Sequence, residues 1–364
     1  MILVKVEINL IMKKLILVLA CTIWVNYLFA APHNIEKPKK IINAIAFYGF
    51  LEDQKIKNAV EKQCNVRFSH DSYYTNAEFL HTFHKQKDYY DVMIFSNMIY
   101  GSIKNQLPNI PKSNLWKSSK SYYPYFKEYY LTHNYTHNTA FFTHAIVGFM
   151  YNPELIDITP EKTMSDIFKA AKDYNVILVD DSGEVGNLLT VGFSDDDKVP
   201  KNKDGTVSLT YENLKRMTQN TKVYITSDFN KLYDSKNFAL SYIWSGDALL
   251  YIKKSGKPYK FVIPSNASSI CTDLIVQMKD TPEANCVARV LQNQSTLEYF
   301  ENNTYYFSPY FKNHIHDESY IALYEQTKKT LTKLRMIQPV ENFEKDYNDN
   351  WNKVKLQISR ENTH

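Results

Sequence analysis

Two carboxylates stand three residues apart in the segment DDSGEV (180–185), between the apolar run NVILV and the sequence GNLLTVGF. One interpretation is a helix cap, in which Asp181 accepts hydrogen bonds from the first helical N–H groups and Glu184 reaches back to the N–H of the cap residue. The other is a ligand site, because open α/β sheets bind ligands at the carboxyl ends of their strands. Taken alone the segment favours the cap, since cap patterns are far commoner than binding sites.

Aromatic and acidic residues recur where other predicted strands end. Phe50 closes a strand candidate and Asp53 follows it, Trp244 ends a second strand in WSGD, and Tyr306 stands in NNTYYFSP. An aromatic face attracts an alkylammonium group by about 0.5 to 2 kcal/mol, and carboxylates form charge-assisted hydrogen bonds with ammonium groups. Rings and acids gathered in one cleft would suit a linear polyamine, although each residue taken alone also fits a core or capping role.

The usual motifs of enzymes are missing from the sequence. No nucleophile elbow, P-loop, dinucleotide-binding glycine set or HExxH occurs, and the chain has only 9 glycines. HTFH (81–84) and HIHD (314–317) place histidines close together, but their spacing supplies no third metal ligand, so we interpret both as solvated surface. The sequence gives no support for an enzyme, a metal site or a cofactor, and we expect none.

The N-terminus predicts export. Lysines, an apolar stretch and small residues follow one another in MKKLILVLACTIWVNYLFAAP (12–32), which is the pattern of a secretory signal peptide. We expect residues 1–30 to be removed by cleavage after Ala30. Two alternatives stay open: an uncleaved anchor, because the apolar stretch is about as long as a membrane helix, and lipoprotein cleavage at Cys21.

Charge and cysteine content limit the possible functions of the mature chain. Residues 1–30 contain three lysines and one glutamate, so their removal lowers the net charge from +4 to +2. This small charge argues against an electrostatic nucleic-acid binder. The odd number of remaining cysteines (Cys64, Cys271 and Cys286) leaves at least one thiol unpaired or paired with another molecule. A Cys271–Cys286 disulfide is one possibility that spacing alone does not establish.

Short strands and helices alternate from Lys40 onward, which predicts α/β units with a largely parallel sheet. A first run contains strand candidates at 42–50, 65–74 and 90–96, and a second run starts near 145–152. The tail from about Ser319 to Ile358 has a helical pattern. We interpret the chain as two α/β lobes followed by helices, with a ligand held between the lobes by hinge closure.

The order of these segments resembles a known family, the bacterial periplasmic spermidine/putrescine-binding proteins. Seven blocks between about Ile41 and Tyr310 follow the family's order: FYGFLEDQKIKNAVEKQCNVRFSHDSYYTNAEFL, YDVMIFSNMIYGSIKNQ, GFMYNPELI, VILVDDSGEVGNLL, YIWSGDAL, FVIPSNAS and YFSPYFKN. The resemblance implies the two-lobed type II periplasmic binding protein fold. The expected lobes are 41–146 plus about 271–313, and 149–269 plus about 314–360.

The resemblance also assigns roles to individual residues. Asp181 and Glu184 fall on the family's acidic pair that meets ligand amines, and Trp244 falls on a ring that packs against the polyamine chain. Ser96 falls on a polar contact, and Tyr306 on a tyrosine near the cleft.

This chain departs from the family pattern at several of these positions. Phe50 replaces a tryptophan but still supplies an aromatic face, and Asp53 and Met98 replace tyrosines. Ile270 stands where a tryptophan is expected.

The largest departure is at the position where the family has an aspartate that binds the ammonium group at the far end of the polyamine. It aligns with Thr272, while Asp273 is next to it. Adjacent residues of a strand face opposite sides, so Asp273 would need a one-residue shift or a bulge to serve. Glu52 or Asp53 would otherwise compensate.

The resemblance predicts a periplasmic, monomeric receptor that binds spermidine or putrescine and delivers it to an ABC permease in the inner membrane, with no chemical step. Two alternatives stay open. The protein could be a sensor that reports its ligand to a membrane signalling partner, or it could keep the fold and bind a different small cation.

Overall fold

A computed structural model describes residues 39–194, 199–202, 205–219, 221–226, 238–264, 266–312, 315 and 317–363. The predicted signal peptide (1–30) and two histidines of the HIHD segment lie outside the described residues. Among the residues that are described, no helix has both the length and the apolar character needed to cross a membrane.

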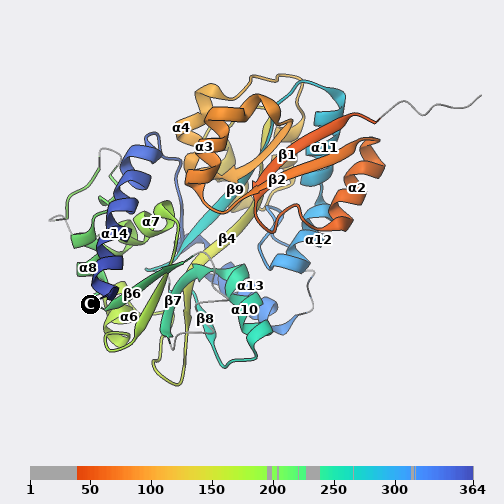
Figure 1. The fold of residues 1–364 in the computed structure, drawn as a ribbon. Helices are drawn as coiled ribbons and strands as arrows, with labels where there is room; N and C mark the ends of the chain where they lie inside the picture. Colours follow the sequence, from red (N-terminus) through yellow and green to blue (C-terminus); the bar gives the residue numbers. More distant parts are fainter. Residues whose placement is uncertain are drawn as a thin grey trace, which may run out of the picture. The chain divides into compact units, whose positions relative to one another are not determined.

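One mixed sheet of ten strands forms the centre of the described fold (Figure 1). Its order is β2-β1-β3-β9-β4-β7-β5-β6, with β10 beside β9 and β8 beside β4. The strands are β1 (Ile41–Phe47), β2 (Arg67–Tyr73), β3 (Val92–Ser96), β4 (Thr139–Tyr151), β5 (Asn175–Val179), β6 (Lys222–Thr226), β7 (Phe238–Trp244), β8 (Lys260–Val262), β9 (Ser269–Gln277) and β10 (Arg335–Met336).

Each end of the sheet is built from parallel strands joined through helices, as the alternating pattern predicts. β1 pairs in parallel with β2 and β3, and the connecting helices are α2 (Gln54–Cys64) and α3 (Asn76–Gln86). β5 pairs in parallel with β6 and β7. The helices α7 (Ser182–Gly192) and α10 (Ser245–Ser255) follow β5 and β7 directly. The carboxyl ends of these strands therefore carry helix starts in both halves of the sheet.

The long strands β4 and β9 run antiparallel to each other through the middle of the sheet and join its two halves (Figure 1). β9 also pairs antiparallel with β3, which places Asp273 opposite Ser96. β4 pairs antiparallel with β7, which places Trp244 opposite Val147. The β4–β9 register shifts between Phe141 and Thr143. Segments far apart in the sequence thus meet at the centre of the sheet.

Residue types at the helix ends account for several helix boundaries. α2 ends at Asn65 with a left-handed φ of 52°, and Thr75 caps α3 through a bond from the Glu78 N–H. Thr281 caps α11, which begins with proline. These signals act within four residues, which is why they can be read from the chain.

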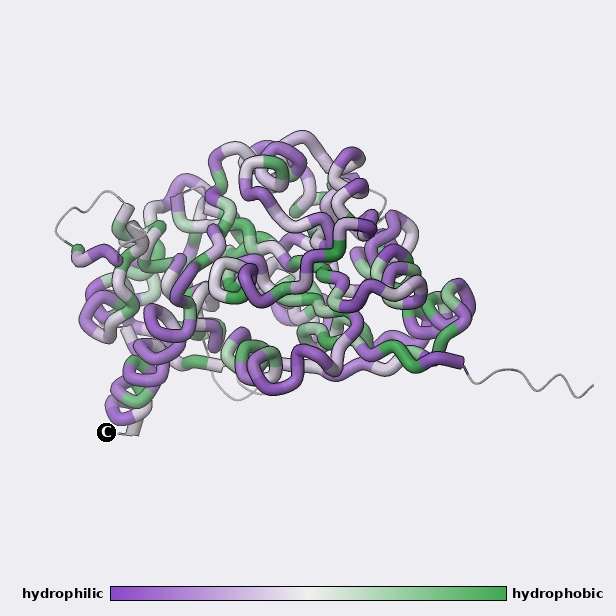
Figure 2. Tube along the Cα trace, turned by 90° about the horizontal axis from the view of Figure 1, so that it is seen from above, coloured by the Kyte–Doolittle hydropathy of each residue, from purple (hydrophilic) through white to green (hydrophobic). Residues whose placement is uncertain are grey.

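The remaining helices cover the sheet and form most of the C-terminal tail. They are α4 (Tyr100–Ile103), α5 (Pro124–Thr132), α6 (Met164–Ala170), α8 (Tyr211–Met217), α11 (Pro282–Gln292), α12 (Gln294–Thr304), α13 (Glu318–Thr330) and α14 (Asp349–Thr363). The prediction of an entirely helical tail is wrong at β10, where Ile337 N–H donates to the carbonyl of Ile270 on β9. Figure 2 shows hydrophobic segments gathered toward the inside of the trace and hydrophilic segments toward its outside.

A disulfide joins Cys64 at the end of α2 to Cys286 in α11, with the Cα atoms 5.7 Å apart. The Cys271–Cys286 pairing considered from the sequence is therefore wrong. Cys271 lies on β9 within the sheet and is a buried free thiol, whereas Cys286 lies on a helix that packs on α2. The division into lobes at 41–146 plus 271–313 and 149–269 plus 314–360 stays a prediction.

Candidate ligand-binding site

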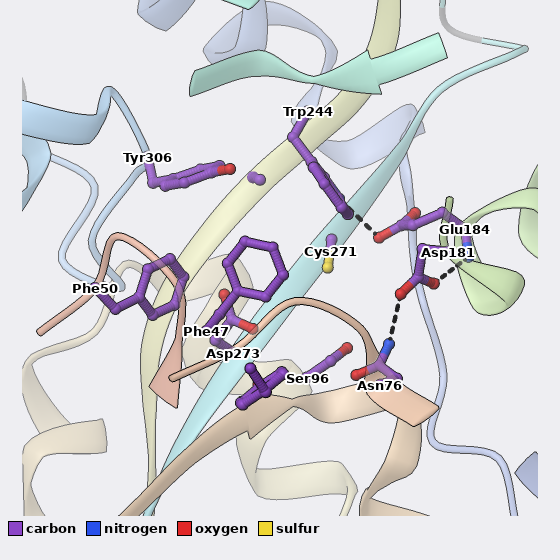
Figure 3. Close-up of a pocket in the computed structure, with 12 residues that line it drawn as sticks. Phe47, Phe50, Asn76, Ser96, Asp181, Glu184, Trp244, Cys271, Asp273 and Tyr306 are labelled. Atoms are coloured by element: carbon purple, nitrogen blue, oxygen red, sulfur yellow. Dashed lines mark hydrogen bonds between the residues drawn. The ribbon is translucent and has the colours of Figure 1, made fainter. Parts of the chain in front are cut away.

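A pocket lies where the two halves of the sheet meet, with about 450 Å³ of empty space that includes part of the open solvent at its mouth (Figure 3). Its walls come from β1, β2, β3, β4, β7 and β9, from the turn after β1, from the helix starts that follow β2 and β5, and from the segment after α12 (Gln294–Thr304). It is lined by Phe47, Phe50, Tyr73, Asn76, Ser96, Ala145, Asp181, Glu184, Trp244, Cys271, Asp273 and Tyr306. Seven of the nine residues predicted to bind ligand are in this lining; Asp53 and Thr272 are not.

Asp181 serves both as a helix cap and as a wall of the pocket. Its Oδ1 accepts hydrogen bonds from the backbone N–H groups of Gly183 at 2.9 Å and Glu184 at 3.0 Å. Its Oδ2 accepts from Asn76 Nδ2 at 2.9 Å. The two interpretations of DDSGEV are therefore compatible, because the cap uses one carboxylate oxygen and the other faces across the sheet.

Glu184 does not complete a capping box, so that half of the capping interpretation is wrong. Its Oε1 accepts a hydrogen bond from Trp244 Nε1 at 3.0 Å (Figure 3). Its Oε2 is buried and accepts no N–H or O–H hydrogen bond from the described residues, and the neighbouring Cys271 thiol, a weak donor, lowers the pKa of this carboxyl only in part against burial. A buried carboxylate oxygen without a donor is costly, so this atom marks a position that a ligand donor would satisfy.

Asp273, and not Thr272, faces the pocket. Thr143 Oγ1 donates to Asp273 Oδ2 at 3.0 Å. Thr272 points to the other side of the sheet, where its hydroxyl lies 2.8 Å from Nδ1 of buried His144. Cys271 stands two residues before Asp273 and shares its face. Of the two neighbouring candidates it is thus Asp273 that reaches the pocket, and the register shift of this strand pair lies opposite it, in β4.

The two acids expected to compensate lie outside the pocket lining. Asp53 caps α2 through a bond from the Lys55 N–H, and it accepts a hydrogen bond from the Tyr299 hydroxyl at 2.8 Å. Glu52 accepts from the hydroxyl of Ser72 and from a neighbouring backbone N–H. Both carboxylates are already used in local structure.

Five aromatic rings surround the acids, and two of them were not predicted. Phe47 and Tyr73 occupy paired positions at the ends of β1 and β2, and their ring centroids are 5.8 Å apart. Phe47 also meets Trp244 edge-on at 5.9 Å, while Phe50 meets Tyr306 at 6.1 Å. In Figure 3 these last two rings lie on the side of the pocket opposite Asp181 and Glu184.

Sequence reasoning also missed Asn76, Ala145 and Cys271. A usable signal existed for Asn76, because it starts the helix that follows β2 and thus lies at the carboxyl edge of the sheet. Ala145 and Cys271 reach the pocket only through the pairing of β4 with β9, which no local pattern reveals.

Burial makes the three carboxylates of the pocket hard to ionise. It raises the pKa of Asp273 to about 7, with a further contribution from the charge of Asp181. Burial and the charge of Asp181 also raise the pKa of Glu184. Burial raises the pKa of Asp181 despite the hydrogen bonds it accepts. None of the described lining residues is basic, so the charge of these acids has no counter-ion within the lining.

Most hydrogen-bond donors of the lining are already committed to acceptors of the protein. Tyr73 donates to the Ile94 carbonyl at 3.2 Å, and Asn76 and Trp244 donate to the two acids of the DDSGEV segment. Tyr306 donates to Asp247 Oδ2 at 2.5 Å. The groups left to face a ligand are therefore chiefly acceptors: carboxylate oxygens and the lone pairs of a phenol.

Comparison with known families identifies the class of this protein. Residues 61–301 match the family described as bacterial extracellular solute-binding protein. The chain belongs to this family. Its members bind solutes and are not enzymes, as the sequence led us to expect. Among curated proteins, none matches the chain significantly.

Solved structures with the same fold share little sequence with this solute-binding protein. It is similar to the spermidine/putrescine ABC transporter substrate-binding protein PotD from Streptococcus pneumoniae, with 16% identity, a TM-score of 0.67, and coverage of 88% of this chain and 99% of that one. A putative spermidine/putrescine ABC transporter from Listeria monocytogenes shows 15% identity, a TM-score of 0.68 and coverage of 88% and 99%.

A third structure has the same fold but a different ligand. The protein MotA from A. tumefaciens B6, in complex with glucopine, shows 12% identity, a TM-score of 0.64 and coverage of 87% and 99%. These likenesses confirm the predicted type II periplasmic binding protein fold. At such low identity the ligand has to be argued from the pocket itself.

Proposed function

We propose that this protein is a receptor for a small aliphatic polyamine such as putrescine or spermidine. The observation that carries the proposal is the composition of the pocket: three carboxylates and five aromatic rings, with no basic residue in the described lining. Buried carboxylates are stabilised in their charged form by a cation close by. Aromatic faces favour the methylene groups and the charge of an alkylammonium chain.

The hydrogen-bonding pattern favours a ligand that brings donors. Glu184 Oε2 accepts no N–H or O–H bond from the described residues, with only the weak S–H donor of Cys271 near this carboxyl, and the Tyr306 phenol directs its own O–H to Asp247. A primary or secondary ammonium group supplies several N–H donors and no acceptor, which matches these vacant acceptors. A quaternary ammonium would leave them unsatisfied.

The same pattern disfavours the other ligand types bound by proteins of this fold. A sugar hydroxyl needs both donors and acceptors from its site, and the lining donors are mostly used within the protein. An opine such as the glucopine of MotA carries a carboxylate. That group would lie among three carboxylates, and like charges at close range repel.

The proposed partner is an ABC permease that takes the amine from this receptor at the membrane. Export is supported by the disulfide between Cys64 and Cys286, since such bonds persist in oxidising compartments. Permease and ATPase genes beside the gene for this chain would favour import, and a gene for a membrane signalling protein would favour the sensor alternative.

Calorimetric titration tests the proposed ligand class. We expect the wild-type protein to bind at least one of putrescine, cadaverine and spermidine with a Kd well below millimolar. Asp181→Asn combined with Glu184→Gln should weaken this binding by about 2 to 5 kcal/mol, because the buried charges that meet the ammonium groups are gone.

A matched control removes two exposed carboxylates instead. Asp280→Asn with Glu325→Gln changes the net charge equally at exposed positions and should change affinity by less than about 1 kcal/mol. Equal losses in both double variants, or no polyamine binding by the wild type, would contradict the proposal.

A further inference from the structure

The binding pocket shares one wall with a second, outer cavity. That cavity has about 300 Å³ of empty space and is lined by Thr75, Asn76, Ala77, Asp180, Asp181, Ser182, Asn348, Trp351, Asn352 and Lys355. Asn76 and Asp181 line both cavities. The hydrogen bond between their side chains, at 2.9 Å, therefore stands where the two cavities meet.

This hydrogen bond joins the two halves of the sheet. Asn76 begins α3, which follows β2, and Asp181 caps α7, which follows β5. The two residues are 105 positions apart in the chain, and each residue is only 7% exposed. Both ends are held in place, Asn76 by a helix start capped by Thr75 and Asp181 by two backbone N–H groups. The hydrogen bond therefore forms a partition between the two cavities, held in place from both sides.

The outer cavity already holds an alkylammonium group that belongs to the protein. Lys355 Nζ lies 2.9 and 3.2 Å from the two carboxylate oxygens of Asp180. The same carboxylate accepts a hydrogen bond from the indole of Trp351 at 2.7 Å. In the inner pocket, Glu184 likewise accepts an indole N–H, from Trp244. The two carboxylates thus share one arrangement, but only the outer one has a cation of the protein beside it.

We propose that the Asn76–Asp181 hydrogen bond sets the length of amine that the pocket accepts, and that Asp180 is an outer ammonium subsite masked by Lys355. The inference rests on the proposed polyamine function. With the bond closed, the far ammonium of a ligand ends at Asp181. A longer amine has to break the bond to reach the outer cavity, and there it meets a carboxylate already paired with a lysine.

A series of linear diamines with three to eight methylene groups tests this inference, with spermidine and spermine added. Asn76→Ala removes the amide that closes the partition and leaves Asp181 Oδ2 open to a ligand. We expect the chain length of tightest binding to move toward longer diamines, with the longest ligands gaining about tenfold relative to the shortest.

Lys355→Met keeps an apolar stem and frees Asp180, so the double variant Asn76→Ala with Lys355→Met should extend the gain to the longest amines. Asn58→Ala changes an exposed asparagine on α2 outside both cavities and should leave the preference unchanged. If Asn76→Ala fails to fold, Asn76→Ser opens the same passage with a residue that suits a helix start, and the melting temperature of each variant is recorded.

Two negative outcomes are distinguishable. If the wild type binds diamines but Asn76→Ala weakens all of them by one factor without moving the optimum, the length-setting role of the bond is wrong and the proposed function stands. If no diamine binds to the wild type or to any variant, both proposals are wrong.

Discussion

At the residue scale, the pocket is defined by where its charges and donors point. Asp181 and Glu184 follow the carboxyl end of β5, Asp273 lies within β9, and the three side chains meet around one cavity. Trp244 donates to one oxygen of Glu184, and the other oxygen stays available to a ligand. Asp247 takes the O–H of Tyr306, so the phenol oxygen presents only its lone pairs to the cavity. The ligand preference therefore depends on these neighbours as much as on the acids.

The free thiol of Cys271 offers a probe of the local charge. Burial and the charges of Glu184 and Asp273 raise its pKa, so it should react slowly, and a positively charged thiosulfonate should react faster than a negatively charged one. Rates are measured from the mass increase of the mature protein, whose other cysteines form the disulfide. Bound putrescine should protect the thiol. A faster reaction with the anionic reagent would contradict the negative potential that we assign to the pocket.

Trp244→Phe keeps an aromatic ring and removes the N–H that donates to Glu184. The buried carboxylate then loses a donor that lowers its pKa, so it should carry less charge at neutral pH. We expect polyamine affinity to fall about five- to thirtyfold, in line with roughly 1 to 2 kcal/mol for such a bond. An unchanged affinity in calorimetry would show that this hydrogen bond has no part in binding.

At the element scale, the parts that could be predicted are those whose causes lie within a few residues. The expected strand end at Trp244 is present, and the cap at Thr281 and the left-handed Asn65 follow from the residue types at those positions. The choice between Thr272 and Asp273 could not be made from the sequence, because the pairing of β9 with β3 and β4 determines which of its residues face the pocket. Those partners are more than a hundred residues away, and no local pattern encodes which face they bury.

Other errors have the same physical origin. β10 is two residues long and exists only beside β9, and the Cys64–Cys286 bond joins helices that are close only in the folded chain. The aromatic pair Phe47 and Tyr73 depends on the register of two strands. The sequence therefore indicated most of the acids and rings that line the pocket, but not which face of the sheet the residues of the central strands occupy.

The disulfide between α2 and α11 should contribute strongly to stability, because it links residues 222 positions apart. Cys64→Ser with Cys286→Ser is expected to lower the free energy of unfolding by about 2 to 5 kcal/mol. Denaturant titration under oxidising conditions measures the loss. Since neither cysteine lines the pocket, the Kd for putrescine should stay within about twofold. A stable variant with lost binding would mean that the helix pair controls the pocket.

At the scale of the whole molecule, the pocket couples ligand binding to pH. In the folded protein the pKa of Asp273 is raised from 3.8 to about 7, and burial raises that of Asp247 from 3.8 to about 6. The ligand-free folded state therefore binds protons more tightly than the unfolded state between about pH 4 and pH 7. By linkage, these groups make the free energy of unfolding rise as the pH falls through that window.

Ligand binding should have the opposite pH dependence, because an ammonium group favours the charged carboxylates. We expect polyamine affinity to weaken as the pH falls from 8 to 5.5, with protons taken up when the ligand leaves. Calorimetry in buffers of different ionisation enthalpy counts these protons. Asp273→Asn should reduce the pH dependence of both the free energy of unfolding and the polyamine affinity. Affinity that is constant or rises toward pH 5.5 would contradict the charge state assigned to the pocket.

The central claim is that this pocket selects a small aliphatic amine over the other solutes that proteins of this fold bind. Native mass spectrometry of the mature protein, mixed with equal amounts of putrescine, spermidine, maltose and glucopine, tests it directly. We predict a complex with one of the two amines and none with the sugar or the opine. A complex with maltose or glucopine, with neither amine bound, would contradict the account.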